Sequence, residues 1–454
     1  MDMSFGTSAY SRENGNIAEL PVVNMYAERS PVEGRVILQS RRGVEVHATV
    51  GDGPIRGLFQ RDGIMSGSLV AVSDDHVFIG STDMGAITGS GAVSFAGDEE
   101  ELAIVAGSNM LATNGTIMWG LAFPGTPFVS GAGFIKTVDL AGYNLALESN
   151  SGRVWFRLWG SSVFDDLDWF TAENEPDRLL DMLAIDDYLV LLGSETIEHW
   201  VKTGDAELPF VPVSGRVFSK GIKATGCCAP FDNGFAWVSK DHIVYRSGNV
   251  PMRISDSGIE ERIEASAWCS VDVYFYEGHE FLRVRGDTFT LQYDAQTGQW
   301  SEQESYGRAN FAGRCAAGAF FGDDTSGTVW TFTDGYTDDG GILERRFRGG
   351  LILDGPGTID CVRLSVNPGQ TPNLSGDYSD PVVEMRASRD AGQTWGAWRP
   401  AQLGAQGKYR QRTETRRWGL FDDPGALFEF RCSDPVPFRV SRVMINPANG
   451  GRSR

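Results

Sequence analysis

The chain has 454 residues, of which 41% are hydrophobic and 22% are charged, so it can bury a sizeable core and is not disordered as a whole. Its 56 glycines follow no collagen period and accompany 12 Trp and 26 Phe, which is typical of an all-β protein with many tight turns. The net charge of −20 excludes tight wrapping of DNA by the protein as a whole, because phosphate binding requires cations.

The charge is unevenly distributed along the chain. Residues 1–344 carry 23 basic and 49 acidic side chains, a net charge of −26, whereas residues 345–454 carry 17 and 11, a net charge of +6. This division favours two domains with different partners, although an acidic surface also serves solubility alone.

The first 55 residues stand apart from the rest. Residues 1–16 are polar and lack the apolar run of a signal peptide, and no stretch approaches the roughly 18 apolar residues of a membrane span. We therefore expect synthesis in a cytoplasm and no membrane span. Residues 1–55 are predicted to form an N-terminal arm and a strand that completes the last blade of the array described next.

Residues 56–345 contain seven β-hairpins, each made of two short apolar runs across a turn of Gly, Asp, Asn or Ser. The hairpins span residues 69–79, 110–119, 145–156, 188–200, 235–245, 281–293 and 319–332. Their starts are roughly 35 to 47 residues apart, which is the spacing of four-stranded propeller blades. We predict an all-β fold with a propeller-like array of about seven hairpin-based blades. A generic β-rich protein stays open as an alternative, since no WD or kelch signature is present.

Residues 346–454 alternate apolar and polar side chains cleanly, for example over 362–366, 427–430 and 438–444. This alternation is the pattern of antiparallel sheets with one buried and one solvated face, so we predict a small C-terminal β-sandwich. The Gly/Pro/Ser/Asp-rich stretch 368–381 is predicted to be an exposed loop.

The sharpest motif lies in this C-terminal domain and fits the Asp-box pattern Ser-x-Asp-x-Gly-x-Thr-Trp. We predict that it forms a structural hairpin turn, in which the carboxylate accepts hydrogen bonds from turn amides and the tryptophan packs beneath. Sialidases carry several such boxes, which leaves a glycan-active propeller open. The box is remote from sialidase chemistry, however, and it lies here outside the predicted propeller, so a structural role is favoured. Its residues are Ser388, Asp390, Gly392, Thr394 and Trp395.

A basic patch with interleaved Tyr409 and Trp418 is the candidate interface of the same domain. Contact with nucleic acid is one interpretation, but Glu414 interrupts the run and the alternation indicates one face of an exposed strand. Docking onto acidic protein neighbours is therefore favoured. The patch comprises Arg345, Arg346, Arg348, Lys408, Arg410, Arg412, Arg416 and Arg417.

No pattern marks a catalytic, cofactor-binding or metal-binding site. The six cysteines form no C-x-x-C pair and are interpreted as reduced and mostly buried, and the five histidines show no metal-ligand spacing. A phosphate-binding loop and a nucleophile elbow are both absent from the sequence. Paired acids such as Asp165-Asp166 are interpreted as solvated turns. We expect no enzymatic activity, no cofactor and no metal.

The central region carries a combination of segments that resembles a known family. Its residues are Asp168-Trp169-Phe170-Thr171-Ala172-Glu173, Pro176-Asp177, Leu192-Gly193-Ser194-Glu195-Thr196-Ile197-Glu198-His199-Trp200, Thr203-Gly204, Leu208-Pro209-Phe210, Ser219-Lys220-Gly221, Trp237 and Val244-Tyr245-Arg246. With Leu20-Pro21-Val22-Val23-Asn24-Met25-Tyr26, this resembles the packaged-DNA stabilisation proteins of short-tailed bacteriophages, also called tail accessory factors or tail nozzle or hub proteins. The resemblance covers roughly residues 20–260. Leu192 replaces a common Phe, and the basic, Asp-box-bearing C-terminal domain is less familiar.

The resemblance implies a structural virion subunit of the phage tail, made in the host cytoplasm, of which six copies form a ring below the portal and its adaptor. Such a ring extends the DNA channel, retains and then releases the packaged genome, and touches needle or tail fibre or spike proteins. DNA would pass through without sequence-specific binding, and the family supplies no catalytic residues. We hypothesise that the acidic residues line this channel, where like-charge repulsion lets DNA slide. The alternatives are a glycan-binding or glycan-hydrolysing, sialidase-like propeller and, less favoured, a secreted adhesion module.

Overall fold

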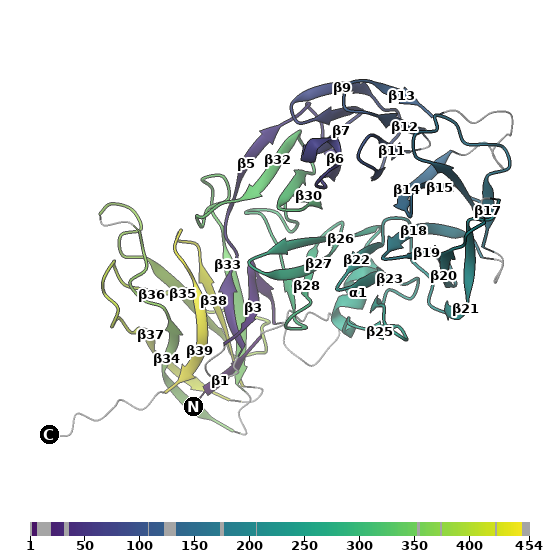
Figure 1. Ribbon diagram of the computed structural model, residues 1–454. Helices are drawn as coiled ribbons and strands as arrows, with labels where there is room; N and C mark the ends of the chain where they lie inside the picture. Colours follow the sequence, from purple (N-terminus) through teal and green to yellow (C-terminus); the bar gives the residue numbers. More distant parts are fainter. Residues whose placement is uncertain are drawn as a thin grey trace.

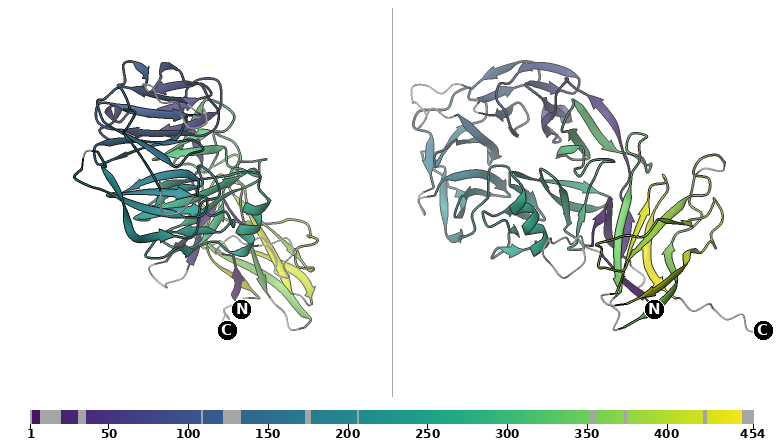
Figure 2. Two further views of the ribbon diagram at one scale, coloured as in Figure 1. Left: turned by 90° about the vertical axis from the view of Figure 1, so that its right-hand side faces the viewer. Right: turned by 180° about the vertical axis from the view of Figure 1, so that it is seen from behind.

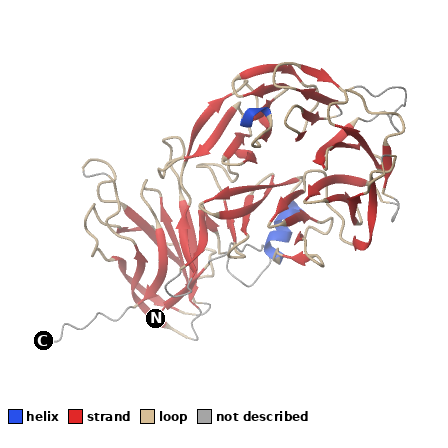
Figure 3. Ribbon diagram, viewed as in Figure 1, coloured by secondary structure: helices blue, strands red, loops and turns tan. Residues whose placement is uncertain are grey.

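The computed structural model describes residues 2–6, 20–30, 36–107, 109–121, 133–172, 177–205, 207–351, 355–372, 375–422 and 425–446. Strands dominate these ranges (Figure 3), which contain one α-helix, α1 (Ser257–Ala265), and one short 3-10 helix, η1 (Met65–Gly67). Glu173 and Pro176, which belong to the segments that carry the family resemblance, lie outside the described residues. The fold class predicted from the sequence is therefore confirmed as all-β.

Seven four-stranded antiparallel units surround a common centre and form a β-propeller (Figures 1 and 2). Blade 1 consists of β6 (Ile55–Phe59), β7 (Val70–Ser73), β8 (His76–Ile79) and β9 (Thr82–Ala86), and blade 2 of β10 (Val93–Gly97), β11 (Leu102–Ala106), β12 (Asn109–Thr113) and β13 (Met118–Gly120). Blade 3 consists of β14 (Phe134–Leu140), β15 (Tyr143–Glu148), β16 (Arg153–Leu158) and β17 (Trp169–Thr171), and blade 4 of β18 (Leu179–Ile185), β19 (Tyr188–Gly193), β20 (Ile197–Lys202) and β21 (Phe210–Phe218). Blade 5 consists of β22 (Cys228–Phe231), β23 (Gly234–Val238), β24 (Val244–Arg246) and β25 (Met252–Arg253), and blade 6 of β26 (Cys269–Tyr276), β27 (His279–Gly286), β28 (Thr290–Asp294) and β29 (Trp300–Glu302). Blade 7 consists of β30 (Gly313–Ala317), β31 (Phe320–Asp323), β32 (Thr328–Phe332) and β5 (Val44–Thr49).

All seven predicted hairpins are present, one in each blade. In six blades the hairpin joins the second and third strands, whereas in blade 2 it joins the third and fourth, β12 and β13. In six blades the two strands outside the predicted hairpin are the first and the fourth, which lie at the blade edges, whereas in blade 2 they are β10 and the central strand β11. Central strands such as β11 and β19 are buried on both faces between neighbouring blades, which explains their continuous apolar runs.

The propeller is closed by a strand from the N-terminal segment. β5 pairs antiparallel with β32 and supplies the outer strand of blade 7, with Val44 opposite Phe332 and Thr49 opposite Thr328. Apolar side chains of blade 7 and blade 1, including Val329 and Ile55, then pack into a single cluster. β5 precedes blade 1 in the sequence, so it links the last blade to the first and covers the outer edge of β32, which would otherwise be unpaired.

The C-terminal domain is a β-sandwich of two packed sheets. One sheet is built from β33 (Arg345–Leu351), β38 (Ala426–Cys432), β35 (Val382–Ser388) and β36 (Arg399–Gln402), and the other from β37 (Thr413–Phe421), β34 (Gly357–Val366), β39 (Arg439–Ile445), β4 (Val36–Ser40) and β3 (Met25–Arg29). β1 (Asp2–Phe5) pairs with β39 by its first half and with β33 by its second half, so it joins the two sheets. Buried and partly exposed residues alternate along β35, as the sequence pattern predicts.

The propeller and the sandwich share a continuous sheet. β2 (Val22–Val23) lies parallel to β29 of blade 6 and antiparallel to β33 of the sandwich. Among the described residues, positions 2–40 thus contribute four strands outside the propeller, whereas the sequence pattern predicts only an arm and one blade-completing strand for residues 1–55. The predicted domain boundaries at 55/56 and 345/346 stay a prediction.

Asn24 and Arg41 fix this junction. Asn24, at φ 54°, donates from Nδ2 to the carbonyl oxygens of Glu304 (3.0 Å) and Glu344 (2.8 Å), while its Oδ1 accepts from Arg41 Nε at 2.9 Å. The buried Arg41 guanidinium also donates to both carboxylate oxygens of Asp338, at 2.9 and 2.8 Å. Asparagine tolerates the left-handed backbone conformation that these bonds require.

Candidate interaction surfaces

The Asp-box residues form the turn that the motif predicts. Ser388 Oγ donates to Asp390 Oδ1 at 2.6 Å and accepts from the Gly392 amide at 2.8 Å. Asp390 Oδ1 accepts from the Thr394 amide at 2.8 Å, and Oδ2 accepts from Thr394 Oγ1 at 2.5 Å. Gly392 has φ 98°, a backbone conformation that favours glycine. The turn therefore owes its shape to side chain–backbone bonds within the motif.

Replacement of Asp390 by alanine is expected to lower the thermal stability of the sandwich slightly at pH 7. These hydrogen bonds lower the pKa of the Asp390 carboxyl to about 2, so the stabilisation is present above the ordinary carboxyl pKa and is lost as the pH falls from about 4 to about 2. Melting curves of wild type and Asp390→Ala between pH 7 and pH 2 check this. The two should converge in acid, and a difference that is independent of pH would contradict the argument.

Trp395 does not stand alone but belongs to a ladder of alternating tryptophans and arginines on the outer face of the sandwich. Arg348 and Arg386 lie over the Trp395 ring at 4.9 and 4.7 Å, and Arg386 and Arg431 lie over the Trp398 ring at 4.3 and 4.2 Å. Such cation–π contacts stabilise each pair by roughly 0.5–1 kcal/mol where solvent reaches them. In the sequence, Trp395 and Trp398 stand out as exposed aromatics, but their Trp-x-x-Trp spacing does not reveal which arginines they contact.

The first three arginines of the predicted basic patch have structural partners. Arg345 is completely buried and donates to the carbonyl oxygens of Cys432 and Val436, so its assignment to a surface patch is wrong. Alternation on β33 places Arg345 inward because its neighbours on both sides point outward. Arg346 pairs with Glu304 and Glu344, and Arg348 pairs with the buried Glu429. These three residues therefore stabilise the sheet.

The other five basic residues are all exposed; Lys408, Arg410 and Arg412 lie on the loop between β36 and β37, whereas Arg416 and Arg417 lie within β37. Arg416 pairs with Glu414 and Asp360, and Arg417 accepts a hydrogen bond from Arg399 at its carbonyl oxygen. No described acidic side chain lies within ion-pair distance of Lys408, Arg410 or Arg412. We refer to residues 407–412, which surround a surface pocket of about 460 Å³, as the basic loop. Its role as an interface remains a prediction.

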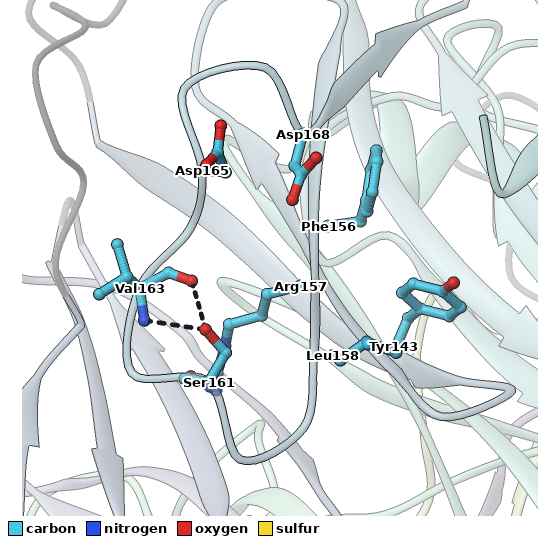
Figure 4. A pocket seen from close by; sticks show the side chains of 8 residues that line it. All are labelled: Tyr143, Phe156, Arg157, Leu158, Ser161, Val163, Asp165 and Asp168. Atoms are coloured by element: carbon cyan, nitrogen blue, oxygen red, sulfur yellow. Dashed lines mark hydrogen bonds between the residues drawn. The ribbon is translucent and has the colours of Figure 1, made fainter. Parts of the chain in front are cut away.

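A second pocket, of about 360 Å³, lies in blade 3 beside the loop that joins β16 to β17 (Figure 4). Arg157 anchors the loop: it donates to Glu101 of blade 2 (2.6 Å), to Asn144 Oδ1 (3.0 Å) and to the carbonyl oxygen of Ser161. The pocket is lined by Tyr143, Phe156, Arg157, Leu158, Ser161, Val163, Asp165 and Asp168. Burial and the charge of Asp165 raise the pKa of the Asp168 carboxyl. The sequence pattern predicts a solvated turn for Asp165-Asp166 and gives no indication of a pocket that Asp165 and Asp168 line together.

Among the described residues, the other titratable and nucleophilic groups lie in structural contacts. The described residues contain no group of three or more His, Cys, Asp or Glu side chains that could hold a metal ion. All six cysteines are free, and Cys227 and Cys269 lie in contact with their sulfur atoms 3.0 Å apart. Burial, with the charge of Arg216 as a second cause, lowers the pKa of His199 to about 4, and His279 Nδ1 lies 3.0 Å from Asp294 Oδ2. None of the described helices is long and apolar enough to cross a membrane.

Comparisons with known proteins agree with the two-part architecture. A family model described as Bacteriophage P22 Gp10, beta-propeller, matches residues 2–330, and one described as Bacteriophage P22 Gp10, beta-sandwich, matches residues 351–447. Among curated proteins, the tail hub protein gp10 of Salmonella phage P22 is 28% identical over 143 residues. This alignment spans 29% of the chain and 30% of the length of that relative.

Solved structures resemble the chain more distantly. The WD40 beta propeller domain of Doa1 aligns with a TM-score of 0.42 and 12% identity over 64% of this chain and 98% of that one. YCF48 from Cyanidioschyzon merolae aligns with a TM-score of 0.41 and 12% identity over the same shares. The extracellular domain of BT4673 from B. thetaiotaomicron aligns with a TM-score of 0.43 and 7% identity, over 91% of this chain and 62% of that one. Likenesses of this degree carry no functional argument.

Proposed function

The chain belongs to the family described as Bacteriophage P22 Gp10, and from this membership we propose that it is a structural subunit of a bacteriophage tail hub. The observation that carries the proposal is the match of both family models, one to the propeller and one to the sandwich. The virion tail is then the place where the protein acts. Synthesis in the host cytoplasm follows from the same assignment.

The finer part of the proposal concerns assembly. We propose a ring, most simply of six copies, that continues the DNA channel below the tail adaptor and retains and then releases the genome. Needle and tail fibre or spike proteins are further proposed partners. The net charge of −26 over residues 1–344 supports a channel along which DNA slides without sequence-specific binding, because the surface repels phosphate.

We also propose that the protein has no enzymatic activity. The Asp box is the main feature that suggests sialidase chemistry, but its side chains form hydrogen bonds within their own turn. The turn belongs to the sandwich and lies outside the propeller. A glycan-binding or glycan-hydrolysing propeller remains the second candidate, favoured by the half-buried Trp395 and Trp398 side chains.

Imaging and a turnover assay separate the two functions. Negative-stain images of the purified chain should show discrete rings, and antibodies against the chain should label the virion tail. Sialosides and host polysaccharides should remain intact in its presence. Absence of the protein from purified virion tails would contradict the tail hub, and turnover of a glycan would favour the second candidate.

A further inference from the structure

The basic loop and the blade 3 pocket have complementary chemistry. In the basic loop, Tyr409 is 66% exposed and is flanked by the exposed cations Lys408, Arg410 and Arg412. The backbone beneath them is fixed, since the amides of Lys408 and Gln411 donate to the carbonyl oxygens of Ala405 and Lys408. The loop therefore presents one aromatic ring among three cations on an ordered support.

The pocket offers the matching groups. Leu158 and Val163, which line the pocket together with Asp165 and Asp168, are exposed by 59% and 37%, so part of the pocket surface is apolar and accessible. Leu158, Val163 and the two carboxylates all line one hollow (Figure 4). Such a surface can accommodate an aromatic ring or the aliphatic part of a long side chain, with positively charged side chains beside it.

The surroundings of the pocket are acidic as well. In an antiparallel blade, the turn between strands 1 and 2 and the turn between strands 3 and 4 lie at the same end. The pocket lies beside the turn between strands 3 and 4 of blade 3, so the corresponding turns of blades 2 and 4 lie at the same end of the propeller as the pocket. Two exposed cations at this end already have partners: Arg61 lies 3.7 Å from Asp139, and Lys202 donates to the Ala141 carbonyl oxygen. The exposed acids of these neighbouring turns are Glu99, Glu100, Asp186, Asp187, Asp205 and Glu207.

The two surfaces cannot meet within one chain. Blade 3, with β17, and the sandwich edge, with β36 and β37, occupy opposite ends of the molecule, and this holds when the molecule is seen from behind (Figures 1 and 2). A contact between two different surfaces of identical subunits is heterologous, and it generates a ring when the rotation closes. A second copy of this chain is thus the partner that supplies the required charge, ring and geometry.

We propose that the basic loop of one subunit docks into the blade 3 pocket of its neighbour and is the contact that links subunits head to tail. Tyr409 lies against the apolar part of the pocket, and the three cations face the carboxylates of the pocket and of the adjacent turns. This contact rests on the proposed function only in that both require self-association, and it assigns that association to the basic loop and the blade 3 pocket.

Charge reversal tests the contact on the full-length chain. Asp165→Lys with Asp168→Lys, and separately Arg410→Glu with Arg412→Glu, should each raise the protein concentration needed for half-assembly on the order of 100-fold, because each places like charges opposite one another. The four substitutions in one chain should restore assembly to within about tenfold of wild type. Tyr409→Ala, which removes an exposed side chain without a core role, should weaken assembly on the order of tenfold.

The matched control reverses two exposed acids at the opposite end of the blades, Asp241→Lys with Glu264→Lys, and should leave assembly unchanged. Mass photometry over a concentration series measures assembly, and thermal melting confirms that each variant is folded. Treatment with a carbodiimide should join Lys408 to a carboxylate at 165–168 in the assembled fraction only.

Three outcomes would overturn the inference. Rings that form equally well with either reversal would refute the contact while leaving the tail-hub function intact, and failure of the fourfold variant to recover would refute the pairing of these two surfaces. A wild-type chain that stays monomeric at every concentration would refute self-docking. The tail-hub function fails separately, by absence of the protein from virion tails.

Discussion

A chain that lacks residues 1–54 is expected to lose cooperative unfolding and to aggregate on expression. The deletion removes β5 and so reopens the propeller between blades 7 and 1. It also removes Met3, Val22, Met25 and Leu38 from the sandwich core. Burial of four such side chains contributes roughly 1.5–3 kcal/mol each, which together is comparable to the about 5–15 kcal/mol by which a folded domain is stable.

Circular dichroism melts and gel filtration measure this effect. The control is a chain that ends at Asn446, because removal of residues 447–454 takes away none of the described residues. A folded, monodisperse product from the N-terminal deletion would show that closure of blade 7 by β5 is dispensable. Addition of a separate peptide of residues 36–54 to the truncated chain should rescue little, because β5 then has to be ordered in a bimolecular step.

The propeller could be predicted because its signal is local. Each blade has a hairpin whose two strands are adjacent in sequence, so a turn such as Asn114-Gly115 and its flanking apolar runs reveal it. The contribution of β1 to β4 to the sandwich could not be predicted in this way. β3 and β4 form a local pair, but the partners that join β1, β2 and β4 to the rest of the fold lie roughly 280 to 440 residues away, for example Glu302 opposite Val23 and Met444 opposite Asp2. A two-residue strand such as β2 also has no periodicity to detect.

At the candidate sites, too, only contacts between residues close in sequence could be predicted. The Asp box is a local motif, and Ser388, Asp390 and Thr394 bond to one another as their spacing predicts. The basic patch was a set of residues close in sequence, and alternation on β33 separates its members, with Arg345 inside and Arg346 outside. The pocket of blade 3 depends on Arg157 reaching Glu101 of another blade, a contact for which the sequence carries no spacing rule.

Replacement of Glu304 by glutamine is expected to stabilise the protein at pH 8 by on the order of 2–3 kcal/mol. Glu304 lies at the junction of propeller and sandwich, and burial is the main reason that its pKa is raised to about 7, with Glu302 and Glu344 adding repulsion and Arg346 opposing it. One pH unit of displacement from an ordinary carboxyl is worth about 1.4 kcal/mol. Glutamine keeps an acceptor oxygen for Arg346, which lies 3.3 Å from the carboxylate, but carries no charge to desolvate.

The sign of the pH dependence follows from proton binding. Between about pH 4.5 and pH 7 the folded state holds a proton on Glu304 that the unfolded state has released, so stability falls as the pH rises through this window and then levels off. The Glu304→Gln variant lacks this fall, so the two proteins should have similar stability near pH 5 and diverge by pH 8. Urea unfolding at pH 5, 6, 7 and 8 measures the difference, with the exposed Glu277→Gln as control. A variant less stable than wild type at pH 8 would show that the ion pair with Arg346 outweighs burial, and that the junction is held together by the charge of Glu304 instead of being weakened by it.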